Sequence, residues 1–99
     1  MIKVEVKKEK NKVKEIKIMG HALYDDYGKD IVCASASSIA ITTINGILSI
    51  DKEAITYEEN KGLTIRILKE NIIIDKLINN MISLLQELSK EYPKNIKFL

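Results

Sequence analysis

Residues 54–92 read AITYEENKGLTIRILKENIIIDKLINNMISLLQELSKEY, and the spacing of the apolar residues changes along this stretch. Leu63, Ile65 and Ile67 alternate with polar residues, which is the pattern of a half-buried β-strand. After Asn71 the apolar residues recur every three or four positions, as in an amphipathic helix. They are Ile74, Leu77, Ile78, Met81, Leu85, Leu88 and Tyr92. The change predicts a domain that combines strands and helices.

The residues on either side extend this pattern. Residues 54–57 and 63–67 flank Asn60–Lys61–Gly62, which is typical of a hairpin turn. Pro93 cannot continue a helix, so the helix is expected to end before it, and residues 95–99 are expected to form a last strand.

The first 19 residues predict two more strands. Ile2, Val4 and Val6 alternate with charged residues, and the polar run 9–12 predicts a turn. A second strand is expected over 13–19, with Ile16 and Ile18 on one face. Val13 is out of phase with them, which predicts a bulge or a late start of the strand.

Between these strands and the second hairpin lie a loop over 20–29 and a buried helix that begins after Asp30. Small residues at 34–38 would let another backbone approach this helix closely, and Gly46 marks a kink or its end. The predicted order is ββαββαβ. We therefore expect an α+β sandwich, a mixed sheet with two helices packed on one face, in a single domain over residues 1–99.

The composition and the beginning of the chain indicate the type of protein and its location. The sequence is 45% hydrophobic and 30% charged, which is a globular profile. The beginning MIKVEVKKEK has no apolar run, so no signal peptide is expected. No apolar stretch is expected to approach the roughly 20 residues of a membrane helix. A single cysteine cannot form an internal disulfide, which fits a reducing compartment, and the predicted location is cytoplasmic.

Positive charge is concentrated at the beginning of the chain. The formal net charge is only +2, yet residues 1–17 contain seven lysines and three glutamates. This segment is either a surface for RNA or an acidic partner, or the solvated face of a hairpin whose lysines protect an edge strand.

The only histidine and the only cysteine, His21 and Cys33, stand twelve positions apart. His21 follows the second predicted strand, and Cys33 falls in the first turn of the first predicted helix. Free N–H groups at a helix start stabilise a thiolate, and an imidazolium adds to this effect. A thiolate, a general base and donors for an oxyanion are the requirements of a cysteine protease.

Other interpretations of these residues stay open on pattern alone. A lone cysteine is commonly a small core residue, and His21 can be an ordinary loop residue. Asp30 can orient the imidazole or only cap the helix. Ser37, one turn after Cys33, can face the same site or serve packing. Two Cys or His residues are too few for structural zinc, so no metal or other cofactor is predicted.

The segments GHA and YGKDIVCASAS resemble the ribosomal-processing cysteine protease family, Prp. The matching positions are Gly20, His21, Ala22, Gly28, Asp30, Ile31, Val32, Cys33, Ala34 and Ser37. The chain departs from the family at Ser35 and Ala36, where the family more commonly has Ala-Val. The resemblance covers the whole chain, because its length and predicted order of elements also agree.

The resemblance implies a function. Members of the family trim the N-terminal extension from the precursor of large-subunit ribosomal protein twenty-seven, after a short apolar stretch that ends in paired aromatics. It assigns the nucleophile to Cys33 and the histidine to His21, with Asp30 and Ser37 as possible supporting residues. It also implies a homodimer. We further expect no membrane partner, no cofactor and no requirement for direct nucleic-acid binding.

An apolar substrate needs apolar subsites. Leu23, Tyr24 and Tyr27 are the residues of the segment 22–29 that can line them, and this segment is expected to close over a bound peptide. The alternative function is a non-catalytic, ribosome-associated binding module that uses the lysine-rich hairpin.

Overall fold

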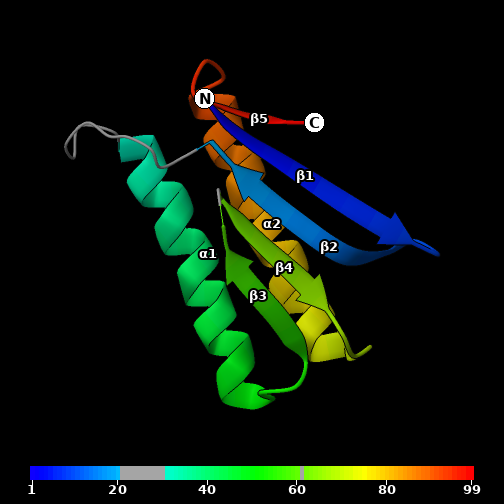
Figure 1. Ribbon diagram of the computed structural model, residues 1–99. Helices are drawn as coiled ribbons and strands as arrows, with labels where there is room; N and C mark the ends of the chain where they lie inside the picture. Colours follow the sequence, from blue (N-terminus) through cyan, green and yellow to red (C-terminus); the bar gives the residue numbers. More distant parts are fainter. Residues whose placement is uncertain (21–30, 61) are drawn as a thin grey trace.

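The computed structural model describes residues 1–20, 31–60 and 62–99. Its elements follow the predicted ββαββαβ order (Figure 1). They are β1 (Ile2–Glu9), β2 (Lys12–Met19), α1 (Ile31–Ile50), β3 (Ile55–Glu59), β4 (Leu63–Ile67), α2 (Ile72–Glu91) and β5 (Ile96–Phe98).

The strands form one mixed sheet in the order β3-β4-β2-β1-β5. The pairs β1–β2, β2–β4 and β3–β4 are antiparallel, and β1–β5 is parallel. Both helices cover the same face of this sheet (Figure 1). The structure confirms the predicted α+β class and the mixed sheet with two helices on it.

The core lies between the sheet and the helices. Alternate strand residues such as Val4, Ile16 and Ile65 are fully buried there, while the charged residues between them point to the open face of the sheet. The helices contribute one buried stripe each. These stripes are Val32, Ala36, Ala40, Ile44 and Ile47 on α1, and Ile74, Ile78, Met81 and Leu85 on α2. The alanines of α1 let its backbone lie close to its neighbours.

The predicted bulge is present in β2. Lys7 pairs with Glu15 and Lys8 pairs with Val13, so Lys14 is the extra residue. One extra residue restores the phase of the following side chain. Val13 accordingly packs against the core although it is out of phase with Ile16 in the sequence.

The turn between β1 and β2 is tighter than predicted. It consists of Lys10 and Asn11, whose φ angles are 51° and 68°. Two-residue hairpin loops of this kind require a left-handed conformation at both central residues, because that twist matches the twist of the strands. The strands therefore extend to Glu9 and resume at Lys12.

Gly46 does not mark the end of helix α1, which continues to Ile50. Nothing lies within 4 Å of a Cβ placed on Gly46. A helix supported by a buried stripe tolerates one glycine at a cost of about 1 kcal/mol, and the tertiary contacts of Ile44 and Ile47 exceed that cost.

The length of α1 corrects a second expectation. The 20 residues Ile31–Ile50 have a mean hydropathy of 1.7, long and apolar enough to cross a membrane by length and composition. The sequence expectation that no stretch approaches this length is therefore wrong. In the described part of the chain the helix lies on the sheet, with Val32, Ala40 and Ile47 in the core. A core helix passes the same test of length and composition, so the helix alone is weak evidence for a membrane span.

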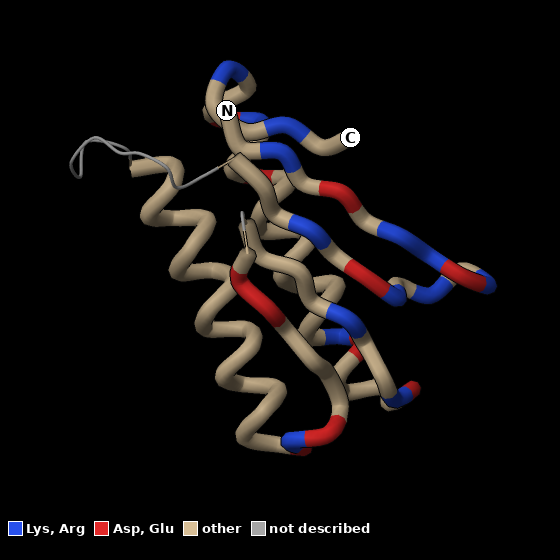
Figure 2. The backbone as a smooth tube through the Cα atoms, in the orientation of Figure 1, with Lys and Arg blue, Asp and Glu red and all other residues tan. Residues whose placement is uncertain are grey.

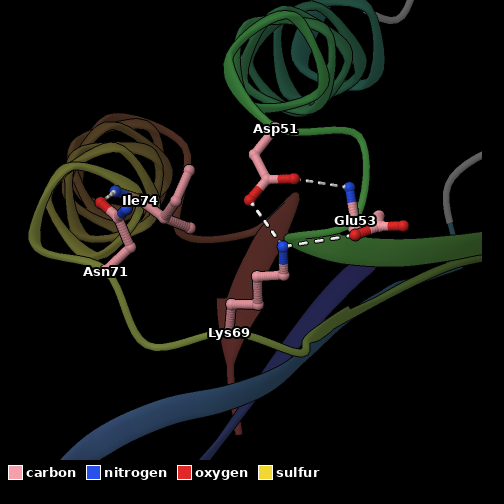
Figure 3. A network of polar contacts seen from close by, with 5 residues as sticks. All are labelled: Asp51, Glu53, Lys69, Asn71 and Ile74. Atoms are coloured by element: carbon pink, nitrogen blue, oxygen red, sulfur yellow. Dashed lines mark hydrogen bonds and ion pairs between the residues drawn. The ribbon is translucent and has the colours of Figure 1, made fainter.

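Helix α2 begins at a capping residue. Asn71 is the N-cap, and its Oδ1 accepts hydrogen bonds from the N–H groups of Ile73 at 2.8 Å and Ile74 at 3.3 Å. Figure 3 shows Asn71 beside Ile74. These bonds satisfy two N–H groups that have no partner within the helix.

We expect Asn71→Ala to lower the free energy of unfolding by about 1 kcal/mol, because the two capping bonds are lost. Urea unfolding followed by circular dichroism measures the change. Asn80→Ala is the matched control, since Asn80 is an exposed residue in the middle of α2 and alanine favours helix there. Equal unfolding midpoints for the two variants would show that the cap contributes nothing.

The end of the molecule beneath α1 holds a small polar network (Figure 3). Lys69 Nζ lies 3.1 Å from Asp51 and 3.4 Å from Glu53. The N–H of Glu53 donates to Asp51 Oδ1 at 2.9 Å. This backbone bond and the Lys69 ammonium hold the pKa of Asp51 below its usual value. The network joins the segment after α1 to the segment after β4.

Candidate active site

Cys33 is the third residue of α1 and lies in its first turn, as predicted. Its side chain is half-buried and packs against the core cluster. N–H groups in the first turn of a helix have no partner within the helix and carry partial positive charge. The position therefore favours a thiolate and offers donors to an oxyanion.

Most of the other predicted site residues cannot be placed. His21, Leu23, Tyr24, Tyr27 and Asp30 lie outside the described residues, as does the whole of segment 22–29. The structure therefore places Cys33 and Ser37 of the predicted set. The pairing of His21 with Cys33 stays a prediction, and so does the choice between capping and orienting roles for Asp30.

Gly20 fixes the path of the chain one residue before His21. Its φ is +83°, a conformation that residues with a side chain rarely adopt. A Cβ at this position would also collide with the carbonyl oxygen of Met1. The glycine of the GHA segment is therefore required by the backbone, and it sets the direction in which the chain leaves β2.

Gly62 brings β4 close to the same end of β2. Its φ is +131°, and a Cβ there would lie 2.7 Å from the carbonyl oxygen of Ile18. Both glycines thus stand where backbones approach at one end of the sheet. The beginning of α1 lies at this end (Figure 1). The first turn of α1, which contains Cys33, is therefore at the same end of the sheet as the end of β2.

A small crevice lies between α1 and the adjoining ends of the strands. It encloses about 20 Å³, roughly the space of one water molecule. It is lined by Ile18, Ala36, Ser37, Ala40, Ile41, Glu59 and Leu63. Ser37 follows Cys33 by four residues, so both lie on the same face of α1. The crevice therefore lies on the face of α1 that carries Cys33, about one turn further along the helix.

A larger groove of about 530 Å³ lies between α1 and α2. Its α1 residues are Ala34, Ser35, Ser38 and Ile39. At about 100° per residue these side chains point on average to the side of the helix opposite Cys33. The groove is larger, but it does not face the candidate nucleophile, so the small crevice is the better candidate for the site.

The crevice lies beside an open edge of the sheet. Within residues 1–20, 31–60 and 62–99, strand β3 is the outermost strand and pairs only with β4. Its last residue, Glu59, lines the crevice, and Tyr57 two residues earlier is half-exposed. The outer edge of such a strand offers backbone N–H and C=O groups with which an extended peptide can pair.

Of the residues that line the crevice, the sequence predicted only Ser37 as a site residue. Glu59 and Ile41, which also line the crevice, were not predicted as site residues. Ile41 follows Ser37 by four residues, so helical spacing could have identified it. Glu59 depends on the order of the strands. Among the described residues, no group of three or more His, Cys, Asp or Glu residues could hold a metal ion.

Comparison with known proteins identifies the family to which the chain is similar. The family described as Cysteine protease Prp matches residues 1–97. Proteins named Ribosomal processing cysteine protease Prp from two strains of Staphylococcus aureus are 36% identical over 93 residues. The match covers 90% of this chain and 88% of each relative.

Solved structures agree with these matches. The essential ribosomal processing protease Prp from S. aureus, in complex with a substrate peptide, superposes with a TM-score of 0.89 and 28% identity. The match covers 100% of this chain and 98% of that one. The same protease with a covalently linked product peptide gives a TM-score of 0.89 and 29% identity, covering 99% of this chain and 97% of that one. A Streptococcus mutans protein with 19% identity and a TM-score of 0.84 shares the fold, covering 99% of this chain and 91% of that one.

Proposed function

The chain belongs to the cysteine protease Prp family and is a cysteine protease, and we propose that it removes the N-terminal extension of the precursor of large-subunit ribosomal protein twenty-seven. The observation that supports this proposal is its likeness, over its whole length, to the S. aureus ribosomal processing protease that holds a substrate peptide. Family membership confirms the resemblance based on GHA and YGKDIVCASAS, and it excludes the non-catalytic alternative.

In the proposed reaction, Cys33 and His21 act as a dyad. The Cys33 thiolate attacks the carbonyl carbon of the scissile peptide bond, and N–H groups at the beginning of α1 donate to the oxyanion. The C–N bond then breaks as the His21 imidazolium gives its proton to the leaving amine. A water molecule, deprotonated by the imidazole, attacks the thioester, and breakage of the C–S bond restores the thiolate.

We expect Cys33 to be alkylated by iodoacetamide faster than a peptide thiol at neutral pH, because the helix start and His21 both favour the thiolate. The rate is measured from pH 5 to pH 9 by mass spectrometry. His21→Ala should shift the rise in rate to higher pH. Identical pH profiles for the His21 variant, the wild type and a free peptide thiol would contradict the dyad.

The substrate is proposed to bind as an extended peptide along the outer edge of β3, with the bond to be cut next to Cys33. This placement is supported by the open edge of β3 and by the crevice at its Glu59 end. Leu23, Tyr24 and Tyr27 are proposed to close over the apolar part of the extension. Asp30 and Ser37 are proposed as supporting residues.

We expect peptides that end in paired aromatics before the cut to be cleaved with at least a tenfold higher kcat/KM than peptides with alanine there, because apolar subsites bind the larger side chains. Tyr24→Ala and Tyr27→Ala should reduce this preference while leaving alkylation of Cys33 unchanged. Equal kcat/KM values for the two peptides with the wild-type enzyme would exclude apolar recognition as the source of specificity.

Assembly and location are also proposals. We infer a homodimer, in accordance with the family resemblance, and a cytoplasmic enzyme whose one cysteine stays reduced. No cofactor takes part in the proposed chemistry. A single domain over 1–99 stays a prediction.

A further inference from the structure

The tip of the β1–β2 hairpin, residues 7–14, projects beyond the sheet (Figure 1). On one side, β5 pairs with β1 only at Ile2–Val4. On the other side, β4 pairs with β2 only at Glu15–Ile18. Among the residues that the structure describes, neither edge of the hairpin tip therefore has a neighbouring strand.

Positive charge dominates the hairpin tip (Figure 2). Five of its eight residues are lysines, against the single acidic residue Glu9. Among the residues that the structure describes, Lys8, Lys10 and Lys14 have no carboxylate within 4.0 Å. Lys12, in contrast, lies between Asp75 at 3.5 Å and Glu70 at 3.7 Å. Lys8 and Lys10 are exposed and Lys14 is partly exposed, so the ammonium groups of these three lysines are available to an anionic partner.

The base of the hairpin adds to the positive field. Glu15 is shared by Lys7 at 3.5 Å, Lys17 at 4.0 Å and Arg66 at 3.0 Å. Desolvation raises the pKa of Glu15, but the three cations together lower it. Arg66 also lies 3.6 Å from Glu58, so two carboxylates face three cations here and one positive charge is in excess.

Lys10 occupies a position that disfavours lysine. Its φ of 51° is in the left-handed region, where a residue with a long side chain costs free energy. Glycine or asparagine meets that requirement at a lower cost. The turn therefore carries a charge where turn geometry alone would favour a neutral residue.

We propose that the hairpin tip binds the phosphate backbone of RNA and so provides a second contact for the protease, apart from its peptide site. Phosphate recognition needs only accessible cations. Protein interfaces need buried aromatic or apolar anchors, and insertion into a membrane needs apolar side chains. The hairpin tip has only Val13, which packs against the core. With no aromatic residue to stack on bases, the binding is independent of sequence.

The test uses a labelled RNA duplex of 20 base pairs and arbitrary sequence, titrated by fluorescence anisotropy. Three phosphate contacts, from Lys8, Lys10 and Lys14, predict that affinity falls about fortyfold between 50 and 200 mM salt. The combined variant Lys8→Gln, Lys10→Gln, Lys14→Gln should lower the slope of log Kd against log salt by about 3. The control variant Lys52→Gln, Lys90→Gln, Lys94→Gln removes the same charge elsewhere and should keep the wild-type slope.

A second variant separates charge from folding. Lys10→Asn removes one cation and relieves the turn, so RNA binding should weaken severalfold while the thermal midpoint does not fall. Cleavage of a short peptide should be unchanged in all variants, which keeps this test independent of the proposed function. Three results would overturn the proposal: no RNA binding by the wild type, equal losses in the hairpin and control variants, or stronger binding to polyglutamate or to phosphatidylserine vesicles than to RNA.

Discussion

Replacing Cys33 by alanine is expected to abolish peptide cleavage, with a fall in kcat/KM of about 10⁴-fold or more, because no other group of the site can form the thioester. The substitution removes one sulfur atom from a half-buried position in the first turn of α1. The loss of stability should therefore be small, about 1 kcal/mol. Cleavage of a fluorogenic peptide and urea unfolding, measured on the same preparation, separate the two effects.

Two further variants serve as controls for this prediction. Cys33→Ser should be nearly as inactive, since a hydroxyl is far harder to deprotonate than a thiol. Thr42→Ala changes an exposed residue of α1 that does not line the crevice, and we expect wild-type activity from it. Activity of Cys33→Ala within tenfold of wild type would refute the assignment of the nucleophile.

The second large effect is expected from Gly20→Ala. Alanine at a φ of +83° costs about 1–2 kcal/mol, and the collision with the Met1 carbonyl adds to this cost. The strained backbone must move at the residue before His21. A displacement of about 1 Å there can reduce kcat about 100-fold, even though Gly20 has no side chain to take part in the chemistry.

Gly46→Ala is the matched control for this substitution. Gly46 lies inside α1, and nothing lies within 4 Å of a Cβ placed there. The control should gain about 0.5–1 kcal/mol of stability, since alanine favours helix, and it should keep wild-type activity. Comparable kcat values for Gly20→Ala and wild type would show that the backbone at Gly20 does not position the site.

Periodicity identified most of the fold before the structure was known. The alternation at Leu63–Ile67 and the spacing of three and four after Asn71 correspond to β4 and α2. Even the bulge at Lys14 follows from one apolar residue out of phase, Val13. These features are local, because each depends on which face of a single strand or helix is buried.

Boundaries and strand order were harder to predict. Gly46 was expected to kink or end a helix that in fact continues to Ile50, because tertiary burial of Ile47 outweighs the propensity of glycine. The 20 residues of α1 have a mean hydropathy of 1.7, so the expectation that no apolar stretch approaches the length of a membrane span was wrong. The order β3-β4-β2-β1-β5 depends on pairings between distant segments, to which local patterns are insensitive.

The candidate site was likewise predictable in part. The place of Cys33 at the start of a helix followed from the residues around it, whereas Glu59 is brought to the crevice only by the pairing of β3 with β4. Gly20 was recognised as a motif residue, and its physical reason, the close approach to Met1, became evident from the structure. The role of His21 stays a prediction.

The central claim is that this protease shortens a ribosomal protein precursor through Cys33. The most direct measurement is the intact mass of the precursor of ribosomal protein twenty-seven from the same organism, after incubation with the wild-type enzyme or with Cys33→Ala. We expect two products from the wild-type reaction, whose masses sum to that of the precursor plus one water. The cut should follow the apolar stretch of the extension. With the variant, the precursor should stay unchanged. Two results would contradict this role of Cys33. One is an unchanged precursor after incubation with wild-type enzyme whose Cys33 can still be alkylated. The other is equal cleavage by both proteins.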